Sequence, residues 1–265
     1  MAVRARHSAR GQHFLRSSAL AAEIVRAAGV RPGDLVLDLG AGSGVLTRAL
    51  ARAGARVVAV ELDPELAHAL RARFRNVLEE DMLRVALPRE PFRVVANLPF
   101  ACTTAVLRRM LDPRVPLLSA DVIVQWEVAV KRSALWPSTR LGVEWSAWHD
   151  LSLVRRLPRS CFAPPPSVDC AVLRAGRRDD SLVPRQEARR YARFVERGFR
   201  DGLRAVLGAR KLKALADQLG FARSAQPRDL DARQWAALYA SSAAAGASAR
   251  QQRRTSVDRP AQEQS

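Results

Sequence analysis

Short apolar runs alternate with amphipathic helical patterns along the first half of the chain, and no other feature constrains the fold as strongly. The runs that read as strands are LVLDL (35–39), ARVVAVE (55–61), NVLEED (76–81), FRVVAN (92–97) and SADVIVQWE (119–127). Apolar residues at helical spacing lie between most of them, and the strands are apolar on both faces. Strands of this kind form a parallel sheet that helices cover on both sides. The pattern therefore predicts a doubly wound α/β domain.

Composition divides the 265-residue chain into three parts. Residues 1–175 carry the alternating pattern and are predicted to form one large domain. Residues 176–240 are rich in arginine, have helical spacing and contain no convincing strand, so we expect a small C-terminal helical domain there. Residues 241–265 are small and polar with little apolar bulk, which predicts a disordered tail.

The charge balance is unusual, because 44 Lys and Arg residues oppose 26 Asp and Glu residues and give a net charge of +18. Such an excess points to a polyanionic partner, of which nucleic acid is the commonest. A membrane surface is the rival, but the chain lacks an apolar run of about 18 residues, and its basic start has no signal-peptide hydrophobic stretch. Three cysteines, Cys102, Cys161 and Cys170, fit no zinc spacing. We expect a cytoplasmic, reduced and metal-free protein.

The first predicted strand leads into a glycine loop, DLGAGSG, which is typical of a ligand site. Asp38 precedes Gly40, Gly42 and Gly44, which are spaced by two. Glycines at this edge of a sheet allow a tight turn and a close approach of the backbone to a ligand. A dinucleotide fingerprint would require glycine at position 45, which is valine. The observed spacing, with an acid before it, instead indicates S-adenosylmethionine, whose ammonium group suits a carboxylate.

Acidic residues also end the next two predicted strands. Glu61 follows the second strand and can accept both ribose hydroxyls, whereas Asp81, with Met82 beside it, can bond the adenine amine. Any one of these acids could be a solvated cap, and each glycine could merely serve a turn. Three acids at successive strand ends, in register with the glycine loop, favour a cofactor site. We therefore predict a Rossmann-like, S-adenosylmethionine-dependent catalytic domain over residues 1–175.

The fourth predicted strand ends in Asn97-Leu98-Pro99-Phe100, opposite the expected cofactor. Taken alone, this tetrapeptide could be an Asx turn in which the proline opens a helix. Beside a methyl donor it offers two acceptors, the side-chain carbonyl of Asn97 and the backbone carbonyl of Leu98, while Pro99 fixes the turn. Two acceptors suit an exocyclic amine such as that of adenine, and Phe100 can stack on a flipped-out base. We predict that these four residues hold the target base.

Six motifs occur in an order that resembles the rRNA adenine-N6 methyltransferases: GQHFL (11–15), DLGAGSGVLT (38–47), VELD (60–63), EEDM (79–82), NLPF (97–100) and CFAPPPSVDCAVLR (161–174). Two branches share this plan, the housekeeping small-subunit dimethylases and the erythromycin-resistance (Erm) enzymes, which modify an adenine of large-subunit rRNA. The chain is more similar to the Erm branch, because Ala41 and Phe100 stand where the housekeeping branch usually has proline and tyrosine. Ser43 stands where Erm enzymes often carry lysine or arginine.

The resemblance implies a role for each motif. The residues implied to bind S-adenosylmethionine are Gln12, His13, Leu15, Asp38, Gly40, Ala41, Gly42, Glu61, Leu62, Asp81, Met82 and Asn97. It also implies that Phe162 forms a second aromatic wall near the target base, although FAPPPS taken alone could be a core-packing loop. The implied substrate is 23S rRNA, free or in a large-subunit precursor. The implied outcome is resistance to macrolide, lincosamide and streptogramin antibiotics, and we expect a monomer.

Basic residues around the expected cleft are candidate RNA contacts. The set comprises Arg4, Arg6, Arg10, Arg16, Arg108, Arg109, Lys131, Arg132, Arg155, Arg156 and Arg159. Any one could be solvated surface, whereas together they indicate backbone binding of looped RNA. The sequence leaves open whether the helical domain at 176–240 binds RNA or only stabilises the first domain. Two rival functions also stay open: a housekeeping 16S rRNA adenine dimethyltransferase, and a non-catalytic RNA-binding or transcription factor on the same fold.

Overall fold

The structure is a computed structural model that describes residues 13–136 and 138–243. The chain forms two units. Among the described residues, the first unit comprises those up to Ala134 together with Trp148–Asp180, and the second comprises those within 135–147 and those from Ser181 to 243. The sequence predicted a single boundary between residues 175 and 176. The second unit also includes 135–147 because backbone hydrogen bonds join Ser138 to Arg228 and Leu182 to Ala147.

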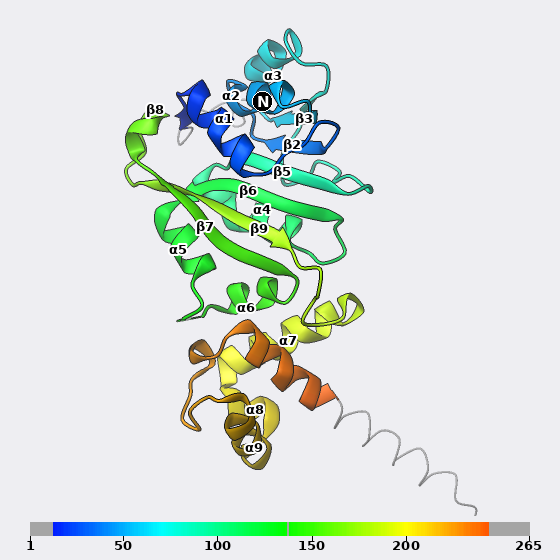
Figure 1. Ribbon diagram of the computed structural model, residues 1–265, viewed down its shortest axis with the longest axis vertical. Coiled ribbons are helices and arrows are strands. Elements are labelled where there is room, and N and C mark those ends of the chain that lie inside the picture. The colour runs from blue at the N-terminus through cyan, green and yellow to red at the C-terminus, as the bar shows by residue number, and fades with distance from the viewer. Residues whose placement is uncertain (1–12, 137, 244–265) are drawn as a thin grey trace, which may run out of the picture. The chain divides into compact units, whose positions relative to one another are not determined.

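Seven strands of the first unit form one sheet in the order β4-β3-β2-β5-β6-β9-β7 (Figure 1). Their bounds are Leu35–Leu39 (β2), Arg56–Glu61 (β3), Val77–Glu79 (β4), Phe92–Asn97 (β5), Leu117–Gln125 (β6), His149–Leu157 (β7) and Cys170–Arg177 (β9). The five strands predicted from the sequence pair in parallel, with Leu37 opposite both Val58 and Val94. β9 pairs antiparallel with β6 and with β7, and these two strands extend the predicted parallel sheet although the sequence analysis did not predict them. No α-helix separates β7 from β9, and without a crossover helix consecutive strands pair antiparallel.

Five α-helices of the described part of the first unit precede or follow these strands. They are α1 (Ser18–Ala27), α2 (Val45–Arg52), α3 (Pro64–Arg71), α4 (Thr103–Met110) and α5 (Trp126–Ser133). Asp63 caps α3, because its carboxylate accepts hydrogen bonds from the backbone of Glu65 and Leu66 at 2.9 and 3.2 Å. α1 and α2 pack against each other and bury apolar side chains with the sheet, including Leu20, Ile24, Leu46, Leu50, Val36, Val95 and Ile123.

A second, two-stranded sheet joins segments far apart in the sequence. β1 (Phe14–Leu15) pairs antiparallel with β8 (Phe162–Ala163), so that Leu15 lies opposite Phe162. The backbone N–H of Arg16 extends this pairing by donating to the carbonyl of Cys161 at 3.0 Å. The N-terminal motif is therefore held in place by the proline-rich loop that precedes β9.

The second unit contains helices and no strands among its described residues. Its elements include α6 (Arg140–Ser146), α7 (Ala188–Asp201), α8 (Leu203–Leu207), α9 (Ala209–Leu219) and a last helix over 232–243. Its core contains the fully buried rings of Tyr191 and Trp235. Phe199 stacks on Trp235 with ring centroids 5.3 Å apart. No helix in the described ranges of either unit is long and apolar enough to cross a membrane.

Gly198 of α7 lies against Trp235 so closely that any side chain would overlap the ring. A Cβ atom built at Gly198 would lie 2.4 Å from Trp235 Cη2. In an open helical position Gly→Ala stabilises a protein by up to about 1 kcal/mol, whereas overpacking a core costs about 1–3 kcal/mol. We expect Gly198→Ala to lower the free energy of unfolding by about 1–3 kcal/mol, measured by urea denaturation. Gly176→Ala is the control, because open space surrounds that position; equal stability of the two variants would contradict the close packing.

Candidate active site

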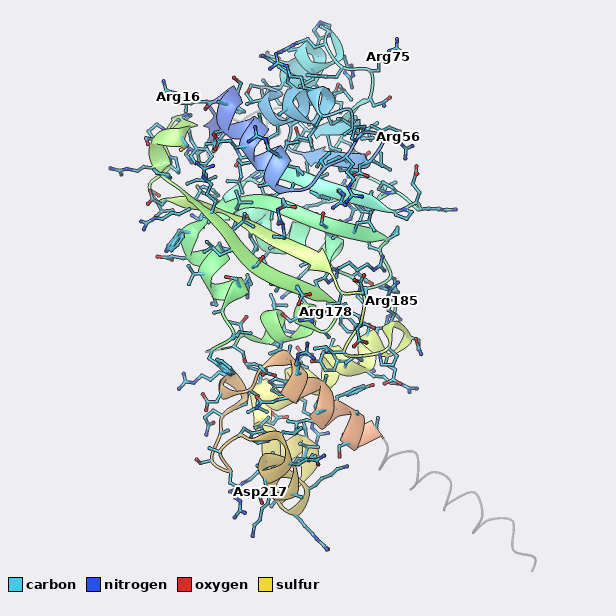
Figure 2. The ribbon with its side chains drawn as sticks, in the orientation of Figure 1. Arg16, Arg56, Arg75, Arg178, Arg185 and Asp217 are labelled. Carbon is cyan, nitrogen blue, oxygen red and sulfur yellow. The ribbon has the colours of Figure 1, made fainter. Side chains whose placement is uncertain are left out.

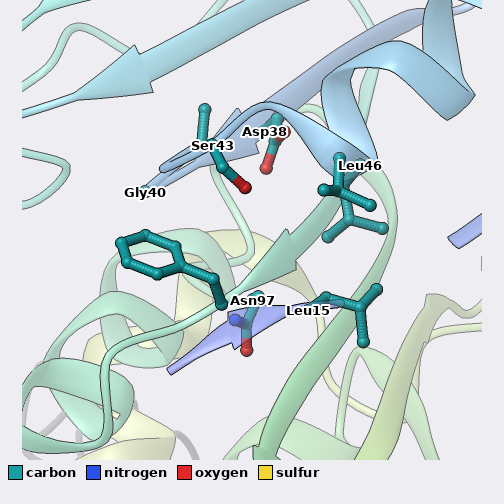
Figure 3. A pocket seen from close by; sticks show the side chains of 9 residues that line it. Leu15, Asp38, Gly40, Ser43, Leu46 and Asn97 are labelled. Carbon is teal, nitrogen blue, oxygen red and sulfur yellow. The ribbon is translucent and has the colours of Figure 1, made fainter. Parts of the chain in front are cut away.

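A pocket lies at the carboxyl ends of β2 and β5, in the middle of the sheet. Its lining comprises Phe14, Leu15, Asp38, Gly40, Ala41, Ser43, Val45, Leu46 and Asn97. Leu15 and Asn97 lie on one side, and Asp38, Ser43 and Leu46 lie on the other (Figure 3). The structure thus brings together the N-terminal motif, the glycine loop and the asparagine at the end of β5, as the sequence predicted.

The glycine loop is the point at which three sequence motifs meet. Gly40 has a φ of +74°, and a Cβ built there would lie 2.9 Å from Met82 Cε and 3.6 Å from Pro99 Cδ. The backbone N–H groups of Gly40 and Ala41 both donate to the carbonyl of Val60, at 2.8 and 3.0 Å. A left-handed conformation and this close approach both favour glycine at position 40. The loop is therefore fixed against β3 and against the segments that carry Met82 and Pro99.

Glu61 ends β3 with its carboxylate turned toward the glycine loop. It is 5% exposed, and it accepts hydrogen bonds from the backbone of Gly42 at 2.7 Å and of Asp63 at 2.9 Å. Each oxygen of an ionised carboxylate can accept a second hydrogen bond, so the group retains acceptor sites for hydroxyls. The next residue, Leu62, is 62% exposed, which is unusual for a large apolar side chain and leaves it free to contact a ligand.

Asp81 and Met82 lie in the loop after β4, where the sequence placed them. Asp81 uses Oδ1 to accept the backbone N–H of Leu83 at 2.8 Å. The Met82 methyl group packs beside Gly40, and its sulfur lies 3.8 Å from Cys102 Sγ. Both side chains are half-buried, so a carboxylate and a thioether border the same edge of the glycine loop.

Asp38 is a fully buried carboxylate in the wall of the pocket. Its Oδ2 accepts a hydrogen bond from the Thr47 hydroxyl at 2.6 Å, whereas its Oδ1 is buried and has no partner among the described residues. Burial raises the pKa of Asp38 to about 7; the Thr47 hydrogen bond opposes this rise and the nearby charge of Glu61 adds to it. A buried acceptor without a partner is costly, and a cationic ligand in the pocket would satisfy it.

Asn97 ends β5 and is oriented by the N-terminal segment. Its Nδ2 donates a hydrogen bond to the backbone carbonyl of His13 at 2.7 Å. This contact occupies the donor end of the amide and leaves the side-chain oxygen as its acceptor end. Asn97 is half-buried and lines the pocket, so the acceptor predicted from the sequence lies beside the glycine loop.

The residues that follow Asn97 form a tight turn into α4. Leu98 is 1% exposed, and its N–H donates to the carbonyl of Ile123 at 3.2 Å. The carbonyl of Pro99 accepts from Cys102 N and Thr103 Oγ1, both at 3.2 Å. Phe100 is half-buried, with its ring centroid 5.4 Å from that of His13. The predicted use of Phe100 as a stacking face and of the Leu98 carbonyl as a second acceptor remains a prediction.

The proline-rich loop has a different role from the one that the resemblance implied. Phe162 is 1% exposed and packs in the core with Leu15 and Leu20, so it presents no aromatic face to the pocket. The expectation that it forms a second wall beside the target base does not fit this position. The loop instead braces the N-terminal motif, because His13 Nδ1 donates to the carbonyl of Pro164 at 2.8 Å. Gln12 lies outside the described residues.

Arg109 is also placed differently from its prediction as an RNA contact. It points from α4 into the loop after β4 and donates hydrogen bonds to the carbonyls of Met82, at 3.0 Å, and Val85. A half-buried guanidinium engaged with two backbone carbonyls serves the protein and not a phosphate. Arg108, the preceding residue, is exposed. Arg109 is therefore a positioning residue that ties the helix after Asn97 to the loop that carries Asp81.

The remaining candidate RNA contacts divide into paired and exposed cations. Arg155 pairs with Glu23, while Arg156 pairs with Asp169 at 2.7 Å and lies over the Trp126 ring at 4.8 Å. Arg16, Arg159 and Lys131 are exposed, Arg132 is half-buried, and Arg16 projects from the surface of the first unit (Figure 2). Arg4, Arg6 and Arg10 lie outside the described residues.

Four pocket residues were missed from the sequence: Phe14, Ser43, Val45 and Leu46. Phe14 lies within GQHFL, between two residues that were selected, and a Cβ built at Gly42 would lie 2.7 Å from its ring. The others belong to the glycine motif and the first turn of α2. Thr47, at the end of that motif, was missed as the partner of Asp38. All of these residues lie within or beside motifs that the sequence analysis had recognised, and this proximity could have identified them.

The described residues fit the cofactor that the sequence predicts. An unpartnered buried carboxylate oxygen suits an ammonium group, and left-handed glycines at 40 and 42 leave backbone without side chains beside it. Glu61 retains acceptor sites for ribose hydroxyls, and Leu62 and Met82 offer apolar surface at the same edge. These residues provide carboxylate acceptors. They lack the glycine at position 45 that a dinucleotide's phosphates would require.

Comparison with known proteins identifies the family. The sequence profile of the ribosomal RNA adenine dimethylases matches residues 3–219. The chain belongs to this family. It is 36% identical over 248 residues to the mycinamicin-resistance protein MyrB of Micromonospora griseorubida, covering 90% of this chain and 79% of that one. It is 35% identical over 206 residues to a small-subunit rRNA methyltransferase A of Chlorobaculum parvum, covering 71% of this chain and 72% of that one.

The fold agrees with the same family. The crystal structure of the 23S rRNA methyltransferase ErmE superposes with a TM-score of 0.76 at 31% identity, covering 85% of this chain and 98% of that one. These findings confirm the prediction of a Rossmann-like rRNA adenine-N6 methyltransferase of the Erm type. They leave the role of each site residue as a prediction.

The raised pKa of Asp38 makes stability depend on pH. Between about pH 4 and about pH 7 the folded protein binds a proton at Asp38 that the unfolded chain has released, because the pKa rises from 3.8 to about 7 on folding. The free energy of unfolding should therefore fall as pH rises through this window, by up to about 1.4 kcal/mol per pH unit. Urea denaturation across the window measures this slope, and Asp38→Asn should flatten it.

Asp217 provides a matched control for this experiment. Its pKa is lowered because it accepts hydrogen bonds from Arg223, and it is exposed, so it titrates below the window. Asp217→Asn should leave the slope between about pH 4 and about pH 7 as in the unmodified protein. A slope that persists in Asp38→Asn would show that another group titrates.

The two carbonyl contacts of Arg109 predict a selective effect on the cofactor side. Arg109→Ala removes both contacts from the loop that carries Asp81 and Met82, so it should weaken cofactor affinity about tenfold, as expected for roughly 1–2 kcal/mol of lost hydrogen bonding. Calorimetry with S-adenosylmethionine measures this. Arg108→Ala, which removes an exposed neighbour on the same helix, should leave cofactor affinity unchanged. Equal effects of the two variants would contradict the positioning role.

Proposed function

We propose that this protein transfers methyl groups from S-adenosylmethionine to N6 of an adenine in 23S rRNA and thereby confers resistance to macrolide, lincosamide and streptogramin antibiotics. The observation that carries the proposal is the orientation of Asn97. Its Nδ2 donates to the His13 carbonyl at 2.7 Å, which leaves the side-chain oxygen as the acceptor of a residue that lines the pocket. The likeness to a mycinamicin-resistance protein and to a 23S rRNA methyltransferase supports the choice of substrate.

The chain's own residues account for cofactor binding. S-adenosylmethionine supplies an electrophilic methyl group on a sulfonium. In the proposed assignment Asp38 accepts from the ammonium group, and the backbone of Gly40 to Gly42 lies along the methionine part. Glu61 accepts hydrogen bonds from the ribose hydroxyls, and Asp81 accepts a hydrogen bond from the adenine amine. Leu62 and Met82 provide apolar contacts to the adenine ring.

The acceptors at the end of β5 hold the substrate amine. Asn97 Oδ1 and the Leu98 carbonyl each accept one hydrogen of the adenine 6-amino group, which aims the nitrogen lone pair at the methyl group. With S-adenosylmethionine bound, the cofactor would supply the methyl group and leave as a neutral thioether, and the nitrogen would lose one of these protons to solvent. Phe100 stacks on the flipped-out base. Catalysis then comes from positioning and from polarisation of the amine, without a strong base.

The charge of the chain suits the proposed partner. A net charge of +18 favours a polyanion, and the exposed cations Arg16, Arg108, Lys131 and Arg159 of the first unit are proposed to contact the RNA backbone. A target base must leave its stack to reach Asn97, so a looped or single-stranded site in the rRNA is favoured. We propose that the protein acts as a monomer in the cytoplasm.

A housekeeping 16S rRNA dimethyltransferase is the second candidate. The 35% identity to a small-subunit enzyme favours it, whereas Ala41 and Phe100 are the residues more similar to the Erm branch. Both candidates use the same amine acceptors, so they differ only in the RNA that is recognised. A non-catalytic RNA-binding protein is a weaker third candidate, because the acids and glycines of the cofactor site are all present.

Methylation of protein-free rRNA separates these candidates. The protein is incubated with S-adenosylmethionine and purified 23S or 16S rRNA, and primer extension maps the modified adenine. We expect modification of 23S rRNA, and Asn97→Ala should reduce the rate by about 100-fold or more, the cost of losing one transition-state contact, while cofactor affinity stays within about threefold.

The alternative outcomes are distinct. Modification of 16S rRNA alone would overturn the 23S assignment and support the housekeeping function. No S-adenosylmethionine binding by calorimetry would overturn the enzyme assignment. Loss of cofactor affinity together with activity in Asn97→Ala would mean that Asn97 maintains the structure through His13 and does not hold the amine.

A further inference from the structure

Helix α7 of the second unit carries a face made of arginines. Arg189, Arg190, Arg193, Arg197 and Arg200 recur at helical spacing, all five are exposed, and we call them the arginine face. At 3.6 residues per turn they fall within about 100° of one another and extend over about 16 Å of helix. The opposite side of α7 buries Tyr191, Val195 and Gly198 in the core of the unit. The arginines therefore lie where nothing in that core requires them.

The arrangement of charges on this face is unfavourable for the helix itself. Arg189 and Arg193, and again Arg193 and Arg197, stand four residues apart, where like charges on a helix destabilise it. An exposed helix that needs only solubility usually alternates acids with bases at this spacing. Here the five arginines of α7 are accompanied by two acids, Glu196 and Asp201. A polyanion bound along the helix would reverse the penalty, because it would neutralise the arginines together.

Few of these arginines are engaged within the protein. Arg200 pairs with the adjacent Asp201 at 2.9 Å, and Arg197 donates to the carbonyl of Ala205 at 2.8 Å. Within the described ranges no carboxylate forms an ion pair with Arg189, Arg190 or Arg193. This contrasts with Arg109, Arg155 and Arg156 of the first unit, whose guanidinium groups have internal partners.

We propose that the arginine face of α7 is a second RNA-binding surface, which contacts the phosphate backbone of the rRNA outside the target nucleotide. The inference rests on the proposed function, since it takes the same rRNA as the ligand. Arginine suits this role because its planar fork binds phosphate oxygens through two parallel hydrogen bonds. The arginine face contacts phosphates and not bases, so it does not distinguish RNA sequences. It adds affinity for a long RNA and leaves the chemistry at Asn97 unchanged.

Charge reversal on the face tests the proposal. Binding of 23S rRNA is measured by filter retention over a range of salt concentrations for the full chain and for the double variant Arg189→Glu/Arg193→Glu. We expect affinity at low salt to fall at least about tenfold and the slope of log affinity against log salt to decrease by about one for each arginine lost. At saturating RNA, kcat and the affinity for S-adenosylmethionine should not change.

Two further variants control for a general effect of net charge and for misfolding of the double variant. Arg210→Glu/Lys213→Glu makes the same change in net charge on exposed positions of α9 in the same unit, and it should cost much less affinity. Glu196→Gln removes one of the two acids beside the face, and it should tighten RNA binding and steepen the salt slope. Because it adds no bulk and no buried group, it also tests the proposal if the double reversal fails to fold.

The outcomes separate this inference from the proposed function. Equal losses in the α7 and α9 variants would indicate a general effect of net charge and overturn the proposal, as would unchanged binding after reversal on α7. Retained RNA affinity together with lost binding to phosphatidylserine vesicles would assign the face to a membrane surface instead. Wild-type protein that binds rRNA through this face but methylates neither subunit's rRNA would overturn the proposed function alone.

Discussion

The hydrogen bond from Asn97 to the His13 carbonyl is the contact on which the site depends, because it joins the end of β5 to the N-terminal segment and fixes the orientation of the Asn97 amide. That segment is itself held by β1–β8 pairing and by the bond from His13 to the Pro164 carbonyl. Phe162 belongs to this support: its burial anchors Leu15, and the residue thought to touch the substrate instead fixes the strand that orients Asn97. Asn97, the proposed amine acceptor, is thus positioned by residues more than 60 positions away on either side.

Two buried carboxylates, those of Glu61 and Asp38, lie on the cofactor side of the site, and they differ in their hydrogen-bond partners. Glu61 is satisfied by two backbone N–H groups, so its charge helps to hold the glycine loop. Asp38 has one hydroxyl partner and one unpartnered oxygen, and burial raises its pKa to about 7. An acceptor left unsatisfied in the core costs stability, and it persists in enzymes where a ligand completes it. The pair therefore combines an acid whose contacts hold the glycine loop with one whose second oxygen has no partner among the described residues, where the proposed function places the ammonium group.

The sequence predicted the five parallel strands, the glycine loop and the position of Asn97, because strand-end residues of a parallel sheet converge at one edge whatever the details of packing. It did not predict the strands β7 and β9, and β7 is largely exposed, so it lacks the two-sided apolar run by which the other strands were recognised. It also misplaced Arg109 and Phe162. In the sequence, an arginine that donates to backbone carbonyls looks the same as one that binds a phosphate. A buried phenylalanine in a proline-rich loop likewise looks the same as an exposed one. Only the contacts distinguish them.

Arginine content by itself is therefore a poor guide to where RNA binds in this protein. Of the cations near the site, Arg109 holds a loop, Arg155 pairs with Glu23, and Arg156 pairs with Asp169 while it covers Trp126. Each of these guanidinium groups already has a partner within the protein. Binding a phosphate would first require that internal contact to break. Exposed cations without carboxylate partners carry no such cost. The cations that are free to bind a polyanion are therefore fewer than the 44 Lys and Arg residues of the chain, and five exposed arginines stand together along α7, where they repel one another.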